Sequence, residues 1–539
     1  MDGIVVNWRR FLLPGITLLV AALIVWHSGN ETEEDLPVED SPSNGTAPYT
    51  PPAFEAVPED ENDNDSAMEE QSFLRENGTD IVVRFSDAAE LAAFRRAWEE
   101  AHPGTSRPIG QLKALRIQLD SPSALRRLLD NLPQDADTSP NLPVQLPRGP
   151  DFDDITATDY QPFTQGLRHW LGATDQVENW GRGITVAVLD TGIADLPGNQ
   201  AFRQIDLLAE TPDARNLSPH GRAVALLLAG EEGLAPASDL LSIRVLDGKG
   251  QGDVFTVAEG IVRAADEGAK IINLSLGSSR DHPVLQDAVN YATARGSLLV
   301  AAAGNEGRDG LPFPAAYPEV FSVTAIDAER QQANFANRGS IDLAAPGVGV
   351  AIPWSEDQFL QMNGTSAASP IVAGAAAALL SEFPDLTPRQ AAEVLRQNAD
   401  DAGPTGPDDR WGQGVISMER SLQHRQQGVH DPAIADIYLH PQPNAEGNYQ
   451  ASITVQNRGT EWSGGLTIWV NDGQKDHSFT INSLDVGESR GLTIPIDAKR
   501  VQSEHGVTLK ALLESPTGLR DDRPDNNEKA VQFHIEVPE

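Results

Sequence analysis

Four residues of the sequence have the side chains that serine-dependent acyl transfer requires. Asp190 ends an apolar run, His220 opens another, Asn305 follows a third, and Ser366 leads into a stretch of small residues. A serine hydroxyl becomes a good nucleophile when a neighbouring base takes its proton, and histidine exchanges protons near neutral pH. A carboxylate can orient the imidazole, and an amide can donate to an oxyanion. These residue types are therefore suited to hydrolysis through a serine nucleophile.

Taken singly, each residue has a common structural role: a turn former, a buried histidine, an amide at a strand end, or a helix cap. The four nevertheless occur in motifs that resemble those of the subtilisin-like serine peptidases, in the same order and at similar intervals. The motifs are Val186-Ala187-Val188-Leu189-Asp190-Thr191-Gly192-Ile193, His220-Gly221-Arg222-Ala223-Val224-Ala225, Val300-Ala301-Ala302-Ala303-Gly304-Asn305-Glu306-Gly307 and Asn363-Gly364-Thr365-Ser366-Ala367-Ala368-Ser369-Pro370. The resemblance implies a catalytic triad of Asp190, His220 and Ser366. It also implies an oxyanion hole formed by Asn305 and the backbone amide of Ser366.

The same resemblance places the peptide substrate. The segments Leu274-Ser275-Leu276-Gly277 and Gly248-Lys249-Gly250-Gln251-Gly252 correspond to those that pair with an extended peptide as added strands. Ala301 to Gly304, which includes Ala302 and Gly304, lines the pocket for the residue before the scissile bond, together with Pro312-Phe313-Pro314. Phe313-Pro314 resembles the family's cis-proline turn. We expect an apolar preference in this pocket.

Three departures from the family pattern lie on the expected histidine helix: Arg222, Ala223 and Leu226 stand where Thr or Ser, His, and Gly are usual. Leu226 must displace a neighbour that a glycine would leave in place. The loop after this helix, Gly230-Glu231-Glu232-Gly233-Leu234, is too short to wrap a calcium ion, which needs six or more oxygens. We expect no metal at that loop and no cofactor.

Short apolar runs alternate with helical or loop stretches around these motifs, at residues 184–189, 240–245, 271–276, 298–303 and 320–325. This pattern is typical of an α/β domain with a parallel sheet covered on both faces. Ligands bind such sheets at the carboxyl ends of the strands. We also expect Pro370 in the first turn of the helix that follows Ser366.

The regions before this domain differ in character. Residues 11–26 are apolar and follow Arg9 and Arg10, which predicts either an uncleaved membrane anchor or a signal peptide, with the rest of the chain exported. Residues 30–70 carry 14 acidic and no basic side chains, which favours a disordered linker. Residues 73–146 read strand, helix, strand, helix, strand. They resemble the ferredoxin-like inhibitor prosegment of secreted subtilisins, with a generic α+β domain as the alternative. We expect Ser86 to cap the first helix and self-cleavage to occur between Leu146 and Gln165.

After a polar hinge, six alternating runs predict a β-sandwich, at residues 451–457, 466–471, 478–481, 491–496, 507–513 and 530–537. The pieces at residues 453–460, 470–473 and 525–527 resemble the cell-adhesion-related domain of bacterial surface proteins. Its ligand would be a protein or a surface. The expected organisation is an anchor or signal peptide (1–28), an acidic linker (29–72), a prosegment (73–150), a catalytic domain (151–423), a hinge (424–431) and a sandwich (432–539).

Composition excludes several functions. A formal net charge of −39 in 539 residues disfavours nucleic acid as a partner, and the absence of cysteine excludes thiol chemistry. An exported esterase would place its serine in Gly-x-Ser-x-Gly, which Gly364 to Ala368 does not match. The remaining alternative is a non-catalytic adhesion or scaffold protein. The sequence thus favours an exported serine endopeptidase that cleaves extended polypeptides.

Overall fold

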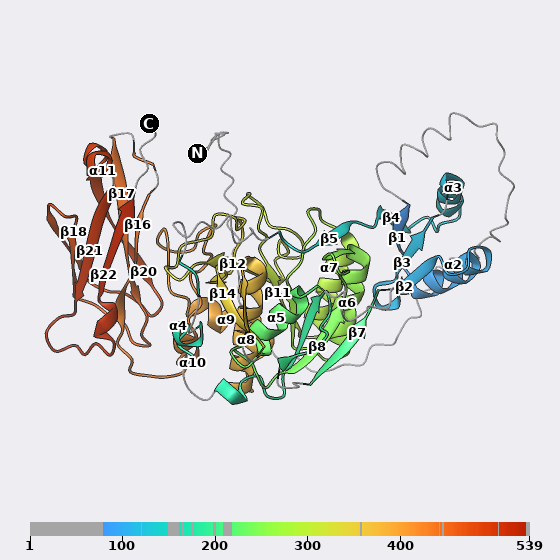
Figure 1. Ribbon diagram of the computed structural model, residues 1–539, viewed down its shortest axis with the longest axis horizontal. Helices are drawn as coiled ribbons and strands as arrows, with labels where there is room; N and C mark the ends of the chain where they lie inside the picture. The colour runs from blue at the N-terminus through green and yellow to red at the C-terminus, as the bar shows by residue number, and fades with distance from the viewer. Residues whose placement is uncertain are drawn as a thin grey trace, which may run out of the picture.

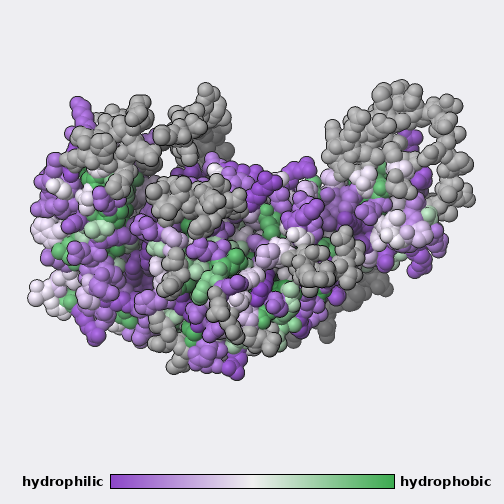
Figure 2. Space-filling view, viewed as in Figure 1, coloured by the Kyte–Doolittle hydropathy of each residue, from purple (hydrophilic) through white to green (hydrophobic). Residues whose placement is uncertain are grey.

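The computed structural model describes residues 79–119, 121–148, 161–163, 167–173, 177–197, 201–208, 218–355, 358–440, 442–444, 447–504 and 506–534. Three units follow one another along the molecule: a small α+β unit, a central α/β domain and a β-sandwich (Figure 1). The visible face is largely hydrophilic, as expected for so acidic a chain (Figure 2). The apolar segment at residues 11–26 and the acidic segment after it lie outside the described residues. Within the described part, no helix is both long and apolar enough to cross a bilayer.

The N-terminal unit is a four-stranded antiparallel sheet in the order β2-β3-β1-β4 with two helices. Its elements are β1 (Asp80–Arg84), α2 (Ala88–Ala101), β2 (Ser106–Ile109), β3 (Ala114–Gln118), α3 (Pro122–Asp130) and β4 (Asp137–Pro140). The prediction that Ser86 caps α2 is wrong: Asp87 is the cap, and its carboxylate accepts from the amide of Ala89. Ser86 instead donates to Glu90, in the first turn of the helix. Strand β2 was not expected, because Ser-Arg-Pro-Ile carries little strand signal.

The central domain contains a seven-stranded parallel sheet in the order β13-β12-β11-β10-β6-β8-β7, which confirms the α/β prediction. The strands are β6 (Thr185–Asp190), β7 (Phe202–Asp206), β8 (Asp239–Arg244), β10 (Ile271–Leu274), β11 (Leu298–Ala302), β12 (Val320–Ile326) and β13 (Leu343–Pro346). Every residue of β10, β11 and β12 is buried, as a sheet covered on both faces demands. Because the strands are parallel, the polar residues that follow their carboxyl ends meet at one edge of the sheet.

Two helical layers cover the sheet. One face carries α5 (His220–Ala229) and α8 (Thr365–Glu382), and the other carries α6 (Val254–Asp266) and α7 (Pro283–Ala294), with a separate apolar core beneath each layer. The second core includes Val82, Ile109 and Leu142 of the N-terminal unit. That unit therefore packs on α6 and α7 with shared apolar burial. The remaining central elements are α4 (Leu167–Trp170), β9 (Gln251–Asp253), the hairpin β14 (Val350–Ser355) and β15 (Gln358–Met362), α9 (Pro388–Gln397) and α10 (Met418–Leu422).

The C-terminal unit consists of two antiparallel sheets around one apolar core, in the orders β16-β17-β20 and β19-β18-β21-β22. Its elements are β16 (Pro432–Leu439), β17 (Asn448–Asn457), β18 (Leu466–Asn471), β19 (Asp476–Ile481), β20 (Ser489–Asp497), α11 (Ala498–Glu504), β21 (Gly506–Glu514) and β22 (Glu528–His534). Six of these strands were expected; β16 was not, because it follows directly on the polar segment read as a hinge.

A buried charge cluster joins the sandwich to the central domain. The carboxylate of Asp400 forms ion pairs with Arg330 and Arg420 of the central domain and with Arg458 of the sandwich. The N–O distances are 3.0, 3.3 and 3.3 Å, respectively. The three guanidinium groups hold the pKa of Asp400 well below its usual range despite its burial. If one domain unfolded alone, it would leave charges of the other domain without their partners, which is costly. We therefore expect the two domains to unfold together.

Candidate active site

Asp190 and His220 meet above the carboxyl end of the sheet. Asp190 is the last residue of β6 and is 1% exposed; its side chain accepts from the amide of Thr191 at 2.7 Å. His220 begins α5, and its Nδ1 lies 3.0 Å from each carboxylate oxygen of Asp190. Gly221 permits this approach, because a Cβ there would lie 2.6 Å from the carbonyl oxygen of Gly192. A carboxylate only accepts, so Nδ1 is the donor in this contact, and Nε2 is the ring nitrogen left for another partner.

Ser366 is the second residue of α8 and is 2% exposed. Among the described residues, no group lies within hydrogen-bonding distance of its hydroxyl oxygen. The hydroxyl thus makes no hydrogen bond to His220 or to any other described group in this structure. The helix N-terminus beneath it favours developing negative charge.

Pro370 lies inside α8, in its second turn, so the prediction that it occupies the first turn is wrong. Because proline has no N–H, the carbonyl oxygen of Ser366 loses its helical partner. The Ser275 hydroxyl replaces it, lying 3.2 Å from that oxygen, and itself accepts from Asn273 Nδ2 at 3.0 Å. A buried side-chain network therefore holds the backbone that carries the candidate nucleophile.

Asn305 follows β11 and is 7% exposed. Its Oδ1 accepts from the amide and the hydroxyl of Thr365, each at 2.9 Å. These two contacts fix the orientation of the side-chain amide, so that Nδ2 can donate to another oxygen. Thr365 is a positioning residue that the sequence reasoning did not single out, although it lies within the Ser366 motif.

A segment of the chain itself lies in the cleft as an added strand. β5 (Pro143–Gln145) pairs antiparallel with β9. Gln145 and Gly277 exchange two backbone hydrogen bonds of 3.0 Å, and the amide of Leu146 donates to the carbonyl of Gly250 at 3.0 Å. The carbonyl oxygen of Pro147 lies 3.5 Å from Asn305 Nδ2. This carbonyl is therefore presented to the candidate oxyanion hole.

The other residues assigned to substrate binding fall into three groups. Gly250 and Gly277 contact the bound strand directly; at Gly250, a Cβ would lie 2.6 Å from the side chain of Leu146. The side chains of Leu274, Leu276 and Ala302 are fully buried in the sheet or its core. Ser275 supports Ser366, and Gly304 donates its amide to the hydroxyl of Thr365 at 3.1 Å. The Phe313–Pro314 peptide is cis, as expected.

Leu226 and Arg222, two of the departures on α5, both pack against neighbouring elements. Leu226 is 5% exposed and joins the core cluster of that face. Arg222 stacks over the Trp354 ring at 4.0 Å and donates to its carbonyl oxygen at 2.9 Å, which fixes the hairpin β14–β15 to the start of α5. The loop after α5 is a tight turn closed by a 2.8 Å bond from the Gly233 amide to the Gly230 carbonyl.

Comparisons with known proteins match the central domain to one family. Residues 181–414 match the model of the Subtilase family. Over 260 residues, 46% of this chain and 71% of the relative, the sequence is 38% identical to the thermostable alkaline protease of Halalkalibacterium halodurans. The chain belongs to the subtilase family. This subtilase is also 36% identical to subtilisin Savinase of Lederbergia lenta over 45% of its own length and 92% of the relative's. It is 33% identical to a thermophilic serine proteinase of Bacillus sp. strain AK1, over 62% and 85% of the two chains.

The family and the relatives identify this subtilase as a serine endopeptidase. Besides the role of Thr365, sequence reasoning did not anticipate two features: the register in which residues 143–147 pair as an added strand, and the support of Ser366 by Ser275. The first depends on a contact between residues about a hundred positions apart. The second follows from Pro370 only when the start of α8 is known.

Proposed function

We propose that Ser366, His220 and Asp190 form the catalytic triad of this endopeptidase. Ser366 Oγ attacks the carbonyl carbon of the scissile peptide while His220 Nε2 takes its proton. Asp190 stabilises the imidazolium through the paired contacts at Nδ1. As the tetrahedral intermediate collapses, the C–N bond breaks and His220 returns the proton to the leaving amine. Water then hydrolyses the acyl-serine by the same steps and regenerates Ser366.

The oxyanion of each tetrahedral intermediate would accept from Asn305 Nδ2 and from the backbone amide of Ser366. The fixed orientation of the Asn305 amide supports this role, because donors that are already oriented require no reorganisation as charge develops. The 3.5 Å contact from Nδ2 to the Pro147 carbonyl is the observation that carries the proposal. It brings a peptide carbonyl to the atoms that would stabilise its oxyanion.

The substrates proposed are extended polypeptides. Gly250 and Gly277 offer main-chain groups on both sides of the cleft, and the pairing of Gln145 and Leu146 illustrates how a peptide would use them. Recognition through the backbone tolerates many sequences. Val144 lies three residues before Pro147 and is 1% exposed. Its burial supports a requirement for an apolar substrate residue at the corresponding position.

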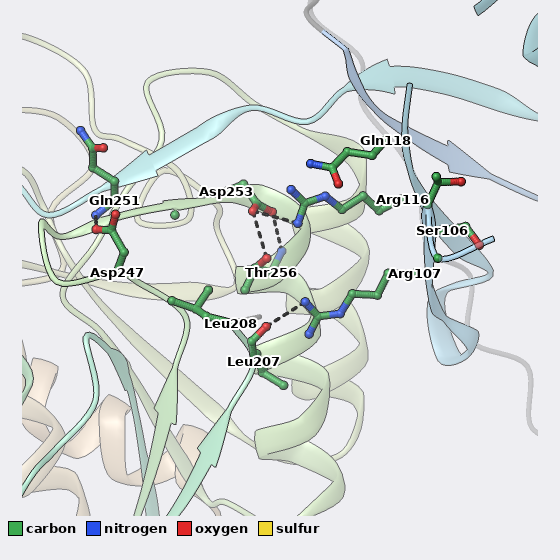
Figure 3. Close-up of a pocket in the computed structure, with 13 residues that line it drawn as sticks. Ser106, Arg107, Arg116, Gln118, Leu207, Leu208, Asp247, Gln251, Asp253 and Thr256 are labelled. Atoms are coloured by element: carbon green, nitrogen blue, oxygen red, sulfur yellow. Dashed lines mark hydrogen bonds and ion pairs between the residues drawn. The ribbon is translucent and has the colours of Figure 1, made fainter. Parts of the chain in front are cut away.

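Residues 73 to about 150 are proposed as an inhibitory prosegment, and Pro147–Arg148 as the first bond cut. Self-cleavage was expected between Leu146 and Gln165. Within that region, the way residues 143–147 pair with the catalytic domain supports this bond, because the carbonyl of Pro147 lies beside Asn305. Figure 3 shows two prosegment arginines beside the catalytic domain: Arg107 donates to the Leu207 carbonyl, and Arg116 pairs with Asp253 at 3.2 Å. Arg107 also pairs with Glu259 at 2.7 Å.

Export is proposed from residues 9–26, with either a cleaved signal or a retained anchor. Arg9 and Arg10 would stay on the cytoplasmic side, so the catalytic domain would act on the other side of the membrane. The sandwich is proposed to bind a protein or surface ligand, on the strength of its resemblance to cell-adhesion-related domains.

The test is purification of the full chain and of its Ser366→Ala variant, followed by casein digestion and sequencing of the new N-terminus. Native protein should cleave casein and yield a chain that begins at Arg148. The Ser366→Ala variant should do neither. Casein cleavage by this variant at the native rate would refute the triad, whereas a different N-terminus would refute only the assigned bond.

A further inference from the structure

Asn337 lies beside the loop that carries Asn305, at the carboxyl edge of the central sheet. Asn305 follows β11, and Asn337 lies between β12 and β13, which are the next two strands across the sheet. Asn337 is polar and yet 0% exposed. A polar side chain is buried at little cost only when its donors and acceptors are paired, so the partners of this amide indicate what it is there to hold.

Among the described residues, the side chain of Asn337 makes three hydrogen bonds, and all of them go to the turn that follows Asn305. Its Oδ1 accepts from the backbone amides of Glu306 and Arg308 at 3.1 and 3.2 Å, and its Nδ2 donates to the Glu306 carboxylate at 2.7 Å. Backbone amides only donate and a carboxylate only accepts, so these partners fix the orientation of the Asn337 amide. One buried side chain therefore binds the turn at three points.

The backbone of Asn337 holds the other side of Asn305. Its amide donates to the carbonyl oxygen of Gly304 at 3.1 Å. Gly304 has a φ of 95°, and a Cβ there would lie 2.3 Å from Asn337 Nδ2, so glycine is what lets the two segments approach. Asn305 is thus fixed between two neighbours that both bind Asn337, while Thr365 orients its side-chain amide.

We propose that Asn337 is a positioning residue for the oxyanion hole: it fixes the backbone on both sides of Asn305, so that the Asn305 amide is in place before the substrate binds. The inference rests on the proposed oxyanion role of Asn305. Donors that are already placed stabilise developing charge without reorganisation, and a displacement of about 1 Å can cost about 10²-fold in rate. Without the Asn337 side chain, the amides of Glu306 and Arg308 must find other partners, and Asn305 moves with them. The loss falls on the transition state, because the oxyanion forms only there.

The test is a double-mutant cycle of Asn337→Ala and Asn305→Ala in the full chain, with kcat and KM measured on a peptide substrate below the melting temperature of every variant. Asn337→Ala should lower kcat about tenfold and change KM by less than about twofold. In the Asn305→Ala background, the same change should lower kcat by less than about twofold, because the group that Asn337 positions is already absent. A kcat of Asn337→Ala within about twofold of native would overturn the inference, and so would the full loss in the Asn305→Ala background.

Asn457→Ala is the matched control for the loss of a buried asparagine. Asn457 is also 0% exposed, and its side chain pairs with backbone groups of Gly459, Glu461 and Leu484 in the sandwich, at 3.0, 2.8 and 3.1 Å. Its removal should lower the melting temperature and leave kcat unchanged. An equal loss of kcat in Asn457→Ala would show that the effect of Asn337→Ala is general destabilisation, and would overturn the inference.

If Asn337→Ala does not fold, Asn337→Asp replaces it. This variant keeps an acceptor for the amides of Glu306 and Arg308 but sets a second carboxylate against that of Glu306, so kcat should fall. Addition of Glu306→Gln should restore kcat, because glutamine can donate to the new carboxylate. An unchanged kcat in Asn337→Asp, or a loss that Glu306→Gln does not restore, would overturn the inference. Failure of the proposed function is detected separately, as a kcat within about fivefold of native in Asn305→Ala alone.

Discussion

Removal of the Ser275 hydroxyl should slow catalysis without loosening substrate binding. Ser275→Ala leaves the buried Ser366 carbonyl without the partner that replaces the missing N–H of Pro370. An unpaired buried carbonyl costs about 1–3 kcal/mol, and the first turn of α8 must shift to recover part of that cost. If about 1–2 kcal/mol appears in the transition state, kcat falls by roughly 5- to 30-fold.

The assay is steady-state hydrolysis of a peptide substrate, with thermal unfolding measured in parallel. KM should change little, because the backbone of Ser275 stays in place, and Ser275→Thr should restore most of the rate. Ser381→Ala is the control: its hydroxyl bonds to Ala378 and Gly181 at the far end of the same helix, each at 2.8 Å. It should lower stability and leave kcat unchanged. A Ser275→Ala enzyme with kcat within twofold of native, or an equal loss of kcat in Ser381→Ala, would refute the reasoning.

Four further outcomes are expected. Asn305→Ala should lower kcat by about 10²–10³-fold in the peptidase assay and should also lower the melting temperature, because the buried Thr365 amide and hydroxyl lose their acceptor; a loss of kcat under fivefold would contradict the oxyanion role. Asp400→Asn should lower the free energy of unfolding by about 3–5 kcal/mol in denaturant titration, because the buried Arg420 and the partly buried Arg330 and Arg458 lose their shared carboxylate. Burial raises the pKa of Asp408 to about 6, so its folded form binds more protons and stability declines as pH rises from about 4 to 6. Asp408→Asn should therefore stabilise the protein at pH 7 by about 1 kcal/mol, after allowance for solvent screening, and should be neutral at pH 3.5. The short turn after α5 predicts that a chelator leaves the melting temperature unchanged; bound calcium between Ala229 and Leu234 with a chelator-induced drop would show this wrong.

The sheet could be predicted because its strands are buried on both faces. Val186–Leu189 and Val300–Ala303 are almost wholly apolar, and short apolar runs that recur between helical stretches are typical of buried parallel strands. Strands β7 and β13 were missed because β7 is polar at the sheet edge and β13 is only Leu-Ala-Ala-Pro. Edge position and short length remove the hydrophobic signal on which sequence reasoning depends.

The candidate triad could be named from motif order, but its supports could not. Thr365 and Ser275 act through contacts across the sheet, and nothing in their local sequence reveals the partner. The cap of α2 was misassigned by one residue, because Ser86 and Asp87 are both good caps and only the start of the helix distinguishes them. Long-range pairing and exact helix boundaries are what the sequence alone leaves open.

The most direct test of the account is the position of a fluorophosphonate adduct. The full chain is labelled at pH 8, digested and mapped by peptide mass spectrometry, alongside His220→Ala and Ser366→Ala. The account predicts one adduct, on Ser366, that is nearly lost in His220→Ala and absent in Ser366→Ala. An adduct on another serine, or equal labelling of Ser366 in the His220→Ala variant, would contradict it.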